Sequence, residues 1–116
     1  MNQELPLLDI QSAINYSNAD EEFVQELRQM LIEVLPEHRD NIQHYADQKD
    51  WDSLAKEAHK LHGALSYTGT PRLKHYSKQL QLTAQEDPSP AKLKPLLQEF
   101  MDTLDQTAKS LDNSSS

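Results

Sequence analysis

Apolar residues recur every three or four positions in four long segments of this 116-residue chain. This spacing places their side chains on one face of an α-helix. Short links that contain Pro, Gly, Asn or Asp separate the segments. Four amphipathic helices with short links bury their apolar faces by packing side by side. The pattern therefore predicts an all-α fold, an antiparallel four-helix bundle with a short additional N-terminal helix.

Capping residues and prolines predict where the first two helices begin and end. The short first helix is expected over residues 7–16, and Asn18 with Glu21 has the spacing of a capping box for the second helix. Pro36 interrupts the apolar stripe of the second helix, and apolar residues continue beyond it, so we expect a kink. Seven apolar residues of this helix are expected in the core: Phe23, Val24, Leu27, Met30, Leu31, Val34 and Leu35.

The third and fourth helices are expected to form a tight antiparallel pair. Asp50 is a favourable N-cap for the third helix, and Gly69 predicts its end. Thr70 and Pro71 then cap and start the fourth helix. The link between the two helices is so short that they must lie against each other.

Two starts are open for the last helix: Pro90, which has the place of a first helical residue after an N-cap, or Lys94, because Pro95 disfavours an earlier start. The Ser-rich tail, residues 112–116, should fray. We expect residues 1–116 to form one monomeric domain with an ordered core over residues 7–111.

Composition excludes several classes of protein. The chain has no cysteine, so it has no disulfide, thiol nucleophile or Cys-based zinc site. It also lacks a signal peptide pattern and any apolar run of the roughly 18 residues needed to span a membrane. A cytoplasmic location is therefore expected. A net charge of −8 argues against a nucleic-acid-binding surface.

The charge is distributed unevenly along the chain. Residues 53–85 hold five basic residues and one acidic residue, whereas the remainder holds six basic and eighteen acidic residues. The simplest interpretation of these basic residues is that they lie on the solvent-exposed faces of two helices. The alternative is a local positive field that attracts a phosphoryl group or an acidic partner surface.

His59 lies at the centre of this basic strip and has unusually small neighbours. A helical wheel places it at the flank of the third helix's apolar stripe, which is formed by Leu54, Ala58, Leu61 and Leu65. Residues on the same face as His59 are Ala55, Lys56, His62, Gly63 and Ser66. Gly63 is unexpected, because mid-helix glycine costs about 0.5–1 kcal/mol relative to alanine. We interpret it as clearing space for a macromolecule to approach His59.

This arrangement suits a phosphoryl carrier. An imidazole nitrogen can accept a phosphoryl group and release it again, provided that a partner's active site can reach it. Donors or positive charge are needed near the phosphoryl oxygens. Lys56, His62 and, from the next helix, Gln81 or Lys78 are the candidates.

The residues H-K-L-H-G-A from His59 to Ala64 resemble the H-x-L-K-G-(small) motif of histidine-containing phosphotransfer (HPt) domains. The run S-Y-T-G-T-P-R-L-K is similar to the HPt modules of BarA/GacS-type hybrid sensor kinases. The resemblance implies that His59 accepts the phosphoryl group and that Gln81 hydrogen-bonds it from the neighbouring helix. The family most often has lysine where this chain has His62.

The resemblance also implies the partners. These would be receiver domains of a hybrid sensor kinase and of a response regulator, which bring the Mg²⁺ and the acceptor carboxylate. No cofactor of its own and no direct membrane contact are expected. The chain would carry phosphate rather than act as an enzyme, either as a free cytoplasmic protein or as the cytoplasmic end of a membrane-bound sensor kinase. The expected docking residues are Ala55, Lys60, Gly63, Ser66 and Lys78, with an apolar rim that includes Leu65 or Tyr67.

Two alternatives compete with the carrier. His59 and His62 could both bind a metal ion, but a zinc site needs a third and usually a fourth ligand, and His75 is the only other histidine in the strip. The second alternative is a helical adaptor without chemistry, which the helix pattern alone allows.

Overall fold

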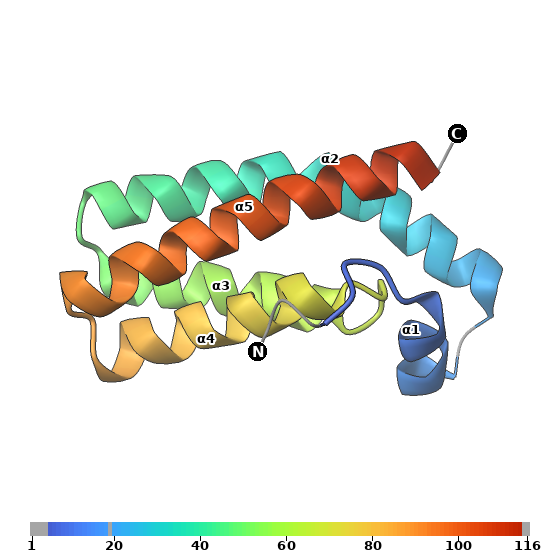
Figure 1. The fold of residues 1–116 in the computed structure, drawn as a ribbon, viewed down its shortest axis with the longest axis horizontal. Helices are drawn as coiled ribbons and strands as arrows, with labels where there is room; N and C mark the ends of the chain where they lie inside the picture. The colour runs from blue at the N-terminus through green and yellow to red at the C-terminus, as the bar shows by residue number, and fades with distance from the viewer. Residues whose placement is uncertain (1–4, 19, 115–116) are drawn as a thin grey trace.

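The structure is a computed structural model that describes residues 5–18 and 20–114. Consecutive long helices run in opposite directions, and the short α1 lies across one end of the bundle (Figure 1). The predicted fold class is confirmed. Within the described residues the helices are α1 (Ile10–Ser17), α2 (Glu21–Asp47), α3 (Trp51–Leu65), α4 (Pro71–Glu86) and α5 (Pro90–Ser114).

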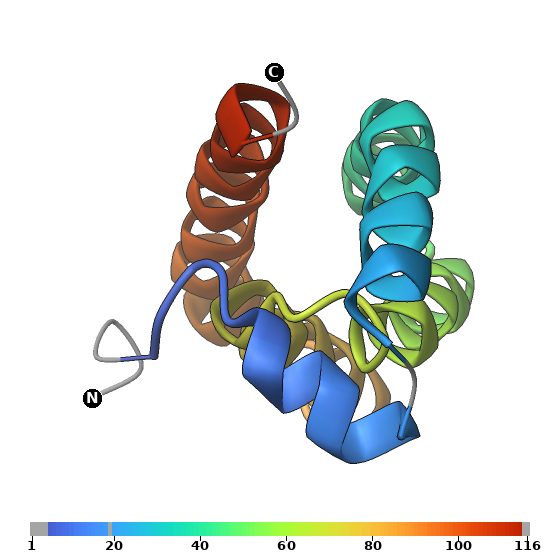
Figure 2. The same cartoon turned by 90° about the vertical axis from the view of Figure 1, so that its right-hand side faces the viewer.

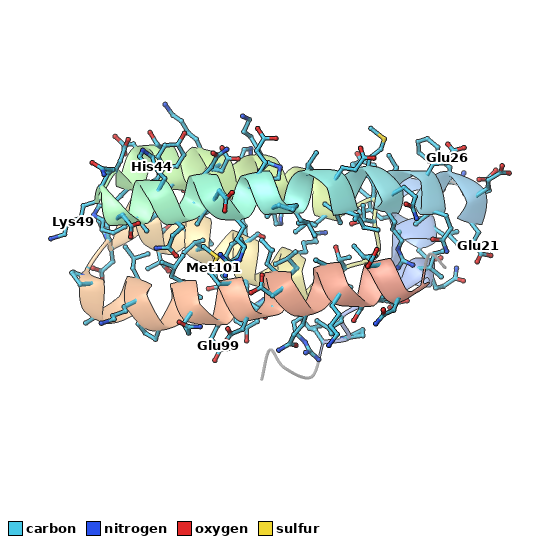
Figure 3. The ribbon with its side chains drawn as sticks, turned by 90° about the horizontal axis from the view of Figure 1, so that it is seen from above. Glu21, Glu26, His44, Lys49, Glu99 and Met101 are labelled. Atoms are coloured by element: carbon cyan, nitrogen blue, oxygen red, sulfur yellow. The ribbon has the colours of Figure 1, made fainter. Side chains whose placement is uncertain are left out.

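The four long helices pack in two layers, with α2 and α5 in one layer and α3 and α4 in the other (Figures 1 and 2). The core lies between them. In Figure 3, Met101 lies between α2 and α5, whereas Glu99 on the same helix points away. The expected stripe of α3 is buried in full, since Leu54, Ala58, Leu61 and Leu65 are each at most 1% exposed.

The expectation for the apolar face of α2 is partly wrong. Val24, Leu31 and Leu35 are buried, but Phe23, Met30 and Val34 are exposed. The apolar residues form two adjacent ridges along α2, and only one of them turns toward the core. The helix continues through Pro36 as predicted, and its N-terminal part is inclined to the rest (Figure 1).

The expected start of α2 is also wrong. Asp20 is its N-cap, and the Oδ1 atom of Asp20 accepts a hydrogen bond from the Phe23 amide at 2.8 Å. Asn18 instead closes α1 in the left-handed conformation, donating its amide to Ile14. The first helix begins at Ile10 rather than at residue 7, because Asp9 caps it through the Ser12 amide.

Three further boundaries are settled by capping. Asp50 is the N-cap of α3, as predicted, and accepts from the Ser53 amide at 3.2 Å. Of the two starts open for α5, the one at Pro90 is confirmed and the one at Lys94 is not: the helical hydrogen bonds of α5 begin at the Ser89 carbonyl, and Pro95 lies inside the helix. The expected fraying is wrong over residues 112–114, which remain helical, while residues 115–116 lie outside the described part.

The link between α3 and α4 corrects the expectation for Gly69. Helix α3 ends at Leu65, and Gly69 lies in the turn that follows, with a φ of 64°. Pro71 is the first residue of α4 as expected, but Thr70 makes no side-chain cap and bonds Thr68 instead, Oγ1 to Oγ1 at 2.9 Å.

A buried arginine holds this link in place. The Arg28 side chain, 5% exposed, donates from Nε to the Thr68 carbonyl at 2.6 Å and from Nη2 to the Gly69 carbonyl at 3.1 Å. Burial lowers the pKa of the Arg28 guanidinium, and the carboxylates of Asp9 and Glu21 oppose this shift. Without Arg28 the two carbonyls would lose charge-assisted partners.

The segment before α1 is strapped across the same link. The Asp9 amide donates to the Gly69 carbonyl at 2.8 Å. Arg72 donates from its backbone to the Pro6 carbonyl at 3.2 Å and from Nε to the Leu5 carbonyl at 2.7 Å. A Cβ atom at Gly69 would collide with the Asp9 carbonyl, so both the φ and the close approach require glycine there.

Candidate functional site

His59 lies on α3 with its imidazole exposed, next to the fully buried Ala58. This agrees with a position at the flank of the apolar stripe. The stripe anchors α3 in the core and fixes the direction in which His59 leaves the helix. The imidazole is therefore held at the surface, within reach of another molecule.

Gln81 of α4 fixes one side of the His59 ring. Its Oε1 atom lies 3.2 Å from His59 Nδ1, and the Gln81 side chain is only 7% exposed. An amide oxygen can only accept a hydrogen bond, so Nδ1 carries the proton of the neutral ring. The lone pair is then on Nε2, which is the nitrogen able to act as a nucleophile.

A hollow of about 630 Å³ opens beside His59, between α3 and α4. Besides His59 and Gln81 it is lined by Ala55, Lys56, Lys60 and Gln85. Lys56 and Lys60 are exposed, so their ammonium groups can turn toward a ligand in the hollow. Gln85 escaped the sequence analysis, although it lies one helical turn after Gln81.

The structure places His62 differently from the lysines. His62 is half-buried, and its pKa is lowered first by this burial and then by the charges of Lys74, Lys78 and His59. It is therefore a neutral imidazole at neutral pH, and it does not line the hollow. Lys78, expected at the docking surface, is half-buried.

Gly63 is exposed, and a Cβ atom built on it would meet nothing within 4 Å. The fold of this domain therefore does not itself require glycine at this position. Ser66, one turn further along, is half-buried. Ala55 is 3% exposed, so it forms the wall of the hollow rather than a contact surface of the expected kind.

An apolar groove of about 430 Å³ lies further along α3, on the side of α2. Tyr67 is 42% exposed on its rim, whereas Leu65, the other residue expected there, is buried. The groove could not be seen from the apolar spacing of α2, because the α2 residues that line it were predicted to lie in the core. Its lining residues are Phe23, Leu27, Met30, Leu31, Val34, Ala64, Tyr67 and Thr68.

Among residues 5–18 and 20–114, no group of three or more His, Asp or Glu side chains is placed to hold a metal ion. In the same part of the chain, no helix has the length and apolar character needed to cross a membrane.

Comparison with known proteins decides the family. The model of the Hpt domain family matches residues 26–113, which is most of the chain. The chain belongs to the Hpt domain family. The match includes α3 and α4, and hence both His59 and Gln81 of this Hpt domain.

Curated relatives of the Hpt domain are the signal transduction histidine-protein kinases BarA of Shigella flexneri and of Escherichia coli strain K12. Each is 28% identical over 102 residues, which is 88% of this chain and 11% of the relative. The domain thus spans about a tenth of the length of these kinases.

A solved structure has the same fold. The HPt domain of the Hpt sensor hybrid histidine kinase from Shewanella superposes with a TM-score of 0.85 at 24% sequence identity. The superposition covers 96% of this chain and 95% of the Shewanella chain. As an Hpt domain, the protein is a phosphoryl carrier of a phosphorelay, a system in which such domains work with receiver domains.

Proposed function

We propose that His59 is the phosphoryl-accepting residue, and that its Nε2 atom takes the group from a receiver-domain aspartate and passes it to a second receiver. The observation that carries this proposal is the hydrogen bond between His59 Nδ1 and the buried Gln81, on an imidazole that is otherwise exposed. That bond leaves the nucleophilic lone pair on the nitrogen that faces away from Gln81.

The chemical step balances without a catalytic group of this domain. The lone pair of His59 Nε2 attacks phosphorus, the bond from phosphorus to the aspartyl oxygen breaks, and the carboxylate leaves with the electron pair. The Nδ1 proton stays in its hydrogen bond to Gln81, so the product is a phosphoimidazolium. The receiver would bring the Mg²⁺ that neutralises charge on the transferring group. The domain would then act as a substrate of its partner and not as an enzyme.

The docking surface would be the face that joins His59 to the apolar groove. Gly63 and Ala64 are both exposed between them and present no bulk. Phe23, Met30 and Tyr67 would bury apolar area against the receiver, while Lys60 would face its acidic cluster. Exchange with such receivers would place the domain in the cytoplasm.

Transfer from a phosphorylated receiver tests the proposal. The protein is mixed with a receiver domain carrying radiolabelled aspartyl phosphate, and acid-labile, base-stable label on the domain is measured. We expect label on the wild type and none on His59→Gln. A His59→Gln protein that still becomes labelled would assign the carrier to another residue, and an unlabelled wild type would favour an adaptor role.

A further inference from the structure

The hollow beside His59 lies on one side of the imidazole, toward the start of α3. Its α3 lining comes from His59, from Lys60 and from the preceding turn, where Ala55 and Lys56 lie. Because α3 and α4 are antiparallel, this turn faces the end of α4 that follows Gln81, which is where Gln85 lies. Free space next to the ring therefore extends toward the start of α3 and away from His62.

The donors in the hollow are available. Gln85 is exposed, and its side-chain amide bonds no partner among residues 5–18 and 20–114. Gln81 holds His59 through its amide oxygen and is only 7% exposed, so it has little room to turn its N–H donors toward a ligand. Lys56 and Lys60 bring positive charge, but each ammonium sits at the end of a flexible stem. Gln85 differs because it offers two N–H donors from a shorter side chain.

His62 lacks the charge to play the same part. It is half-buried against the Lys74 and Lys78 side of α4, where both burial and those charges keep the imidazole neutral. The lysines of that side also lie outside the hollow. The side of His59 that has both free space and donors is therefore the opposite one, lined by Lys56 and Gln85.

We propose that Gln85, together with Lys56, binds the oxygens of the phosphoryl group carried on His59 Nε2, and that His62 does not. The proposal rests on His59 being the acceptor. Gln85 donates its amide N–H groups to the phosphoryl oxygens, and Lys56 compensates their charge. No bond is made or broken by Gln85; it stabilises the phosphorylated form relative to the free imidazole.

The test uses direct phosphorylation of the full chain, which avoids any effect on docking. Phosphoramidate transfers its phosphoryl group to the imidazole, the P–N bond of the reagent breaks, and ammonia leaves. The ³¹P NMR signal of phosphohistidine is then followed against pH. A neighbouring donor favours the dianionic phosphoryl group, so Gln85→Leu should raise the midpoint of this titration. Gln85→Glu should raise it further, because a carboxylate repels the dianion.

A second measurement is the equilibrium of phosphate between this domain and a receiver, at concentrations below their dissociation constant. Loss of one hydrogen bond to a charged group should move it toward the receiver by about threefold to tenfold in Gln85→Leu. Gln79→Leu is the matched control, because residue 79 points about 160° away from residue 81 on α4 and does not line the hollow. It should match the wild type in both measurements.

The outcomes separate the two proposals. No phosphohistidine signal in the wild type, or a wild-type signal fully retained in His59→Gln, overturns the proposed function, because a retained signal would come from another histidine such as the exposed His44. Suppose instead that the wild type is phosphorylated on His59, and that Gln85→Leu has the same titration midpoint and the same phosphate equilibrium with the receiver. Only the role of Gln85 is then refuted. A larger shift in His62→Gln than in Gln85→Leu would also refute it, since the support would then lie on the other side of the ring.

Discussion

The Nδ1 atom of His59 lies 3.2 Å from the Oε1 atom of Gln81, so a buried amide on α4 orients an exposed imidazole on α3. Gln81→Leu keeps much of the side-chain volume but removes the acceptor. The neutral ring can then carry its proton on Nε2, which loses the nucleophilic lone pair. We expect phosphorylation of His59 by phosphoramidate to slow by about tenfold, as for the loss of a hydrogen bond worth about 1.4 kcal/mol.

The rate is measured from the growth of the phosphohistidine ³¹P signal, with Gln79→Leu as the control on the same helix. Circular dichroism should give the same helix content for both variants. Equal rates in Gln81→Leu and wild type would mean that this hydrogen bond does not set the reactive tautomer.

Gly63 lets stability and function be separated. A Cβ atom there meets nothing within 4 Å, so Gly63→Ala should stabilise the domain by about 0.5–1 kcal/mol through helix propensity. The larger Gly63→Leu should fold as well, but its side chain would stand where the receiver approaches His59. We expect urea denaturation to show no loss of stability and receiver-dependent transfer to fall strongly.

Phosphoramidate distinguishes blocked access from a damaged site, because a small donor needs no docking surface. Gly63→Leu should therefore react with phosphoramidate about as fast as the wild type. Normal transfer from the receiver to Gly63→Leu would contradict the access argument.

Arg28 is expected to support the fold without taking part in the chemistry. Arg28→Met keeps an unbranched apolar chain but leaves the carbonyls of Thr68 and Gly69 without their guanidinium donor. We expect a loss of about 2 kcal/mol in the free energy of unfolding, because the buried Thr68 carbonyl is left unsatisfied while the Gly69 carbonyl keeps the Asp9 amide as a donor. Urea denaturation measures this, and phosphorylation by phosphoramidate under stabilising conditions should be retained. An unchanged urea midpoint would show that the link between α3 and α4 is held by other contacts.

His62 predicts a dependence of stability on pH. Its pKa is lowered in the folded state from the ordinary value of 6.5, so the unfolded chain binds the proton more readily. The folded state therefore loses stability as the pH falls below about 6.5, until His62 is also protonated in the fold. His62→Gln removes this contribution.

The comparison is the fall in urea midpoint between pH 7.5 and pH 5.0, measured for the wild type and for His62→Gln. The variant should lose less stability, while the titration of other groups remains common to both proteins. An equal fall in the two proteins would mean that the surroundings of His62 do not disfavour its charge.

The sequence predicted the number, order and direction of the helices because their apolar residues keep a helical period over many turns. It did not predict which apolar residues of α2 the neighbouring helices would bury. Periodicity gives the width of an apolar face, but only the positions of neighbouring helices decide that Leu31 is buried and Met30 exposed. Capping was ambiguous for a similar reason, since Asn18 and Asp20 are both good caps and the chain path selects between them.

For the candidate site too, contacts within one helix could be predicted from spacing, and contacts between helices could not. His59, Gly63 and Lys56 share a helix, so their proximity follows from spacing alone. The contact with Gln81 came from the family resemblance and is seen in the structure. Gln85 lies one helical turn after Gln81, but its place beside His59 follows from the register of two antiparallel helices, which fixes the residues that face each other across their groove.

The segment before α1, residues 5–9, affects where such a domain can be cut from a larger polypeptide. The family match starts at residue 26, inside α2, yet the Asp9 amide is bonded to Gly69 in the turn before α4, and the carbonyls of Leu5 and Pro6 are bonded to Arg72 at the start of α4. A fragment trimmed to the family limits would strip those partners from Gly69 and Arg72. Expression boundaries for this domain should accordingly be drawn upstream of Leu5, well before the point where family likeness begins.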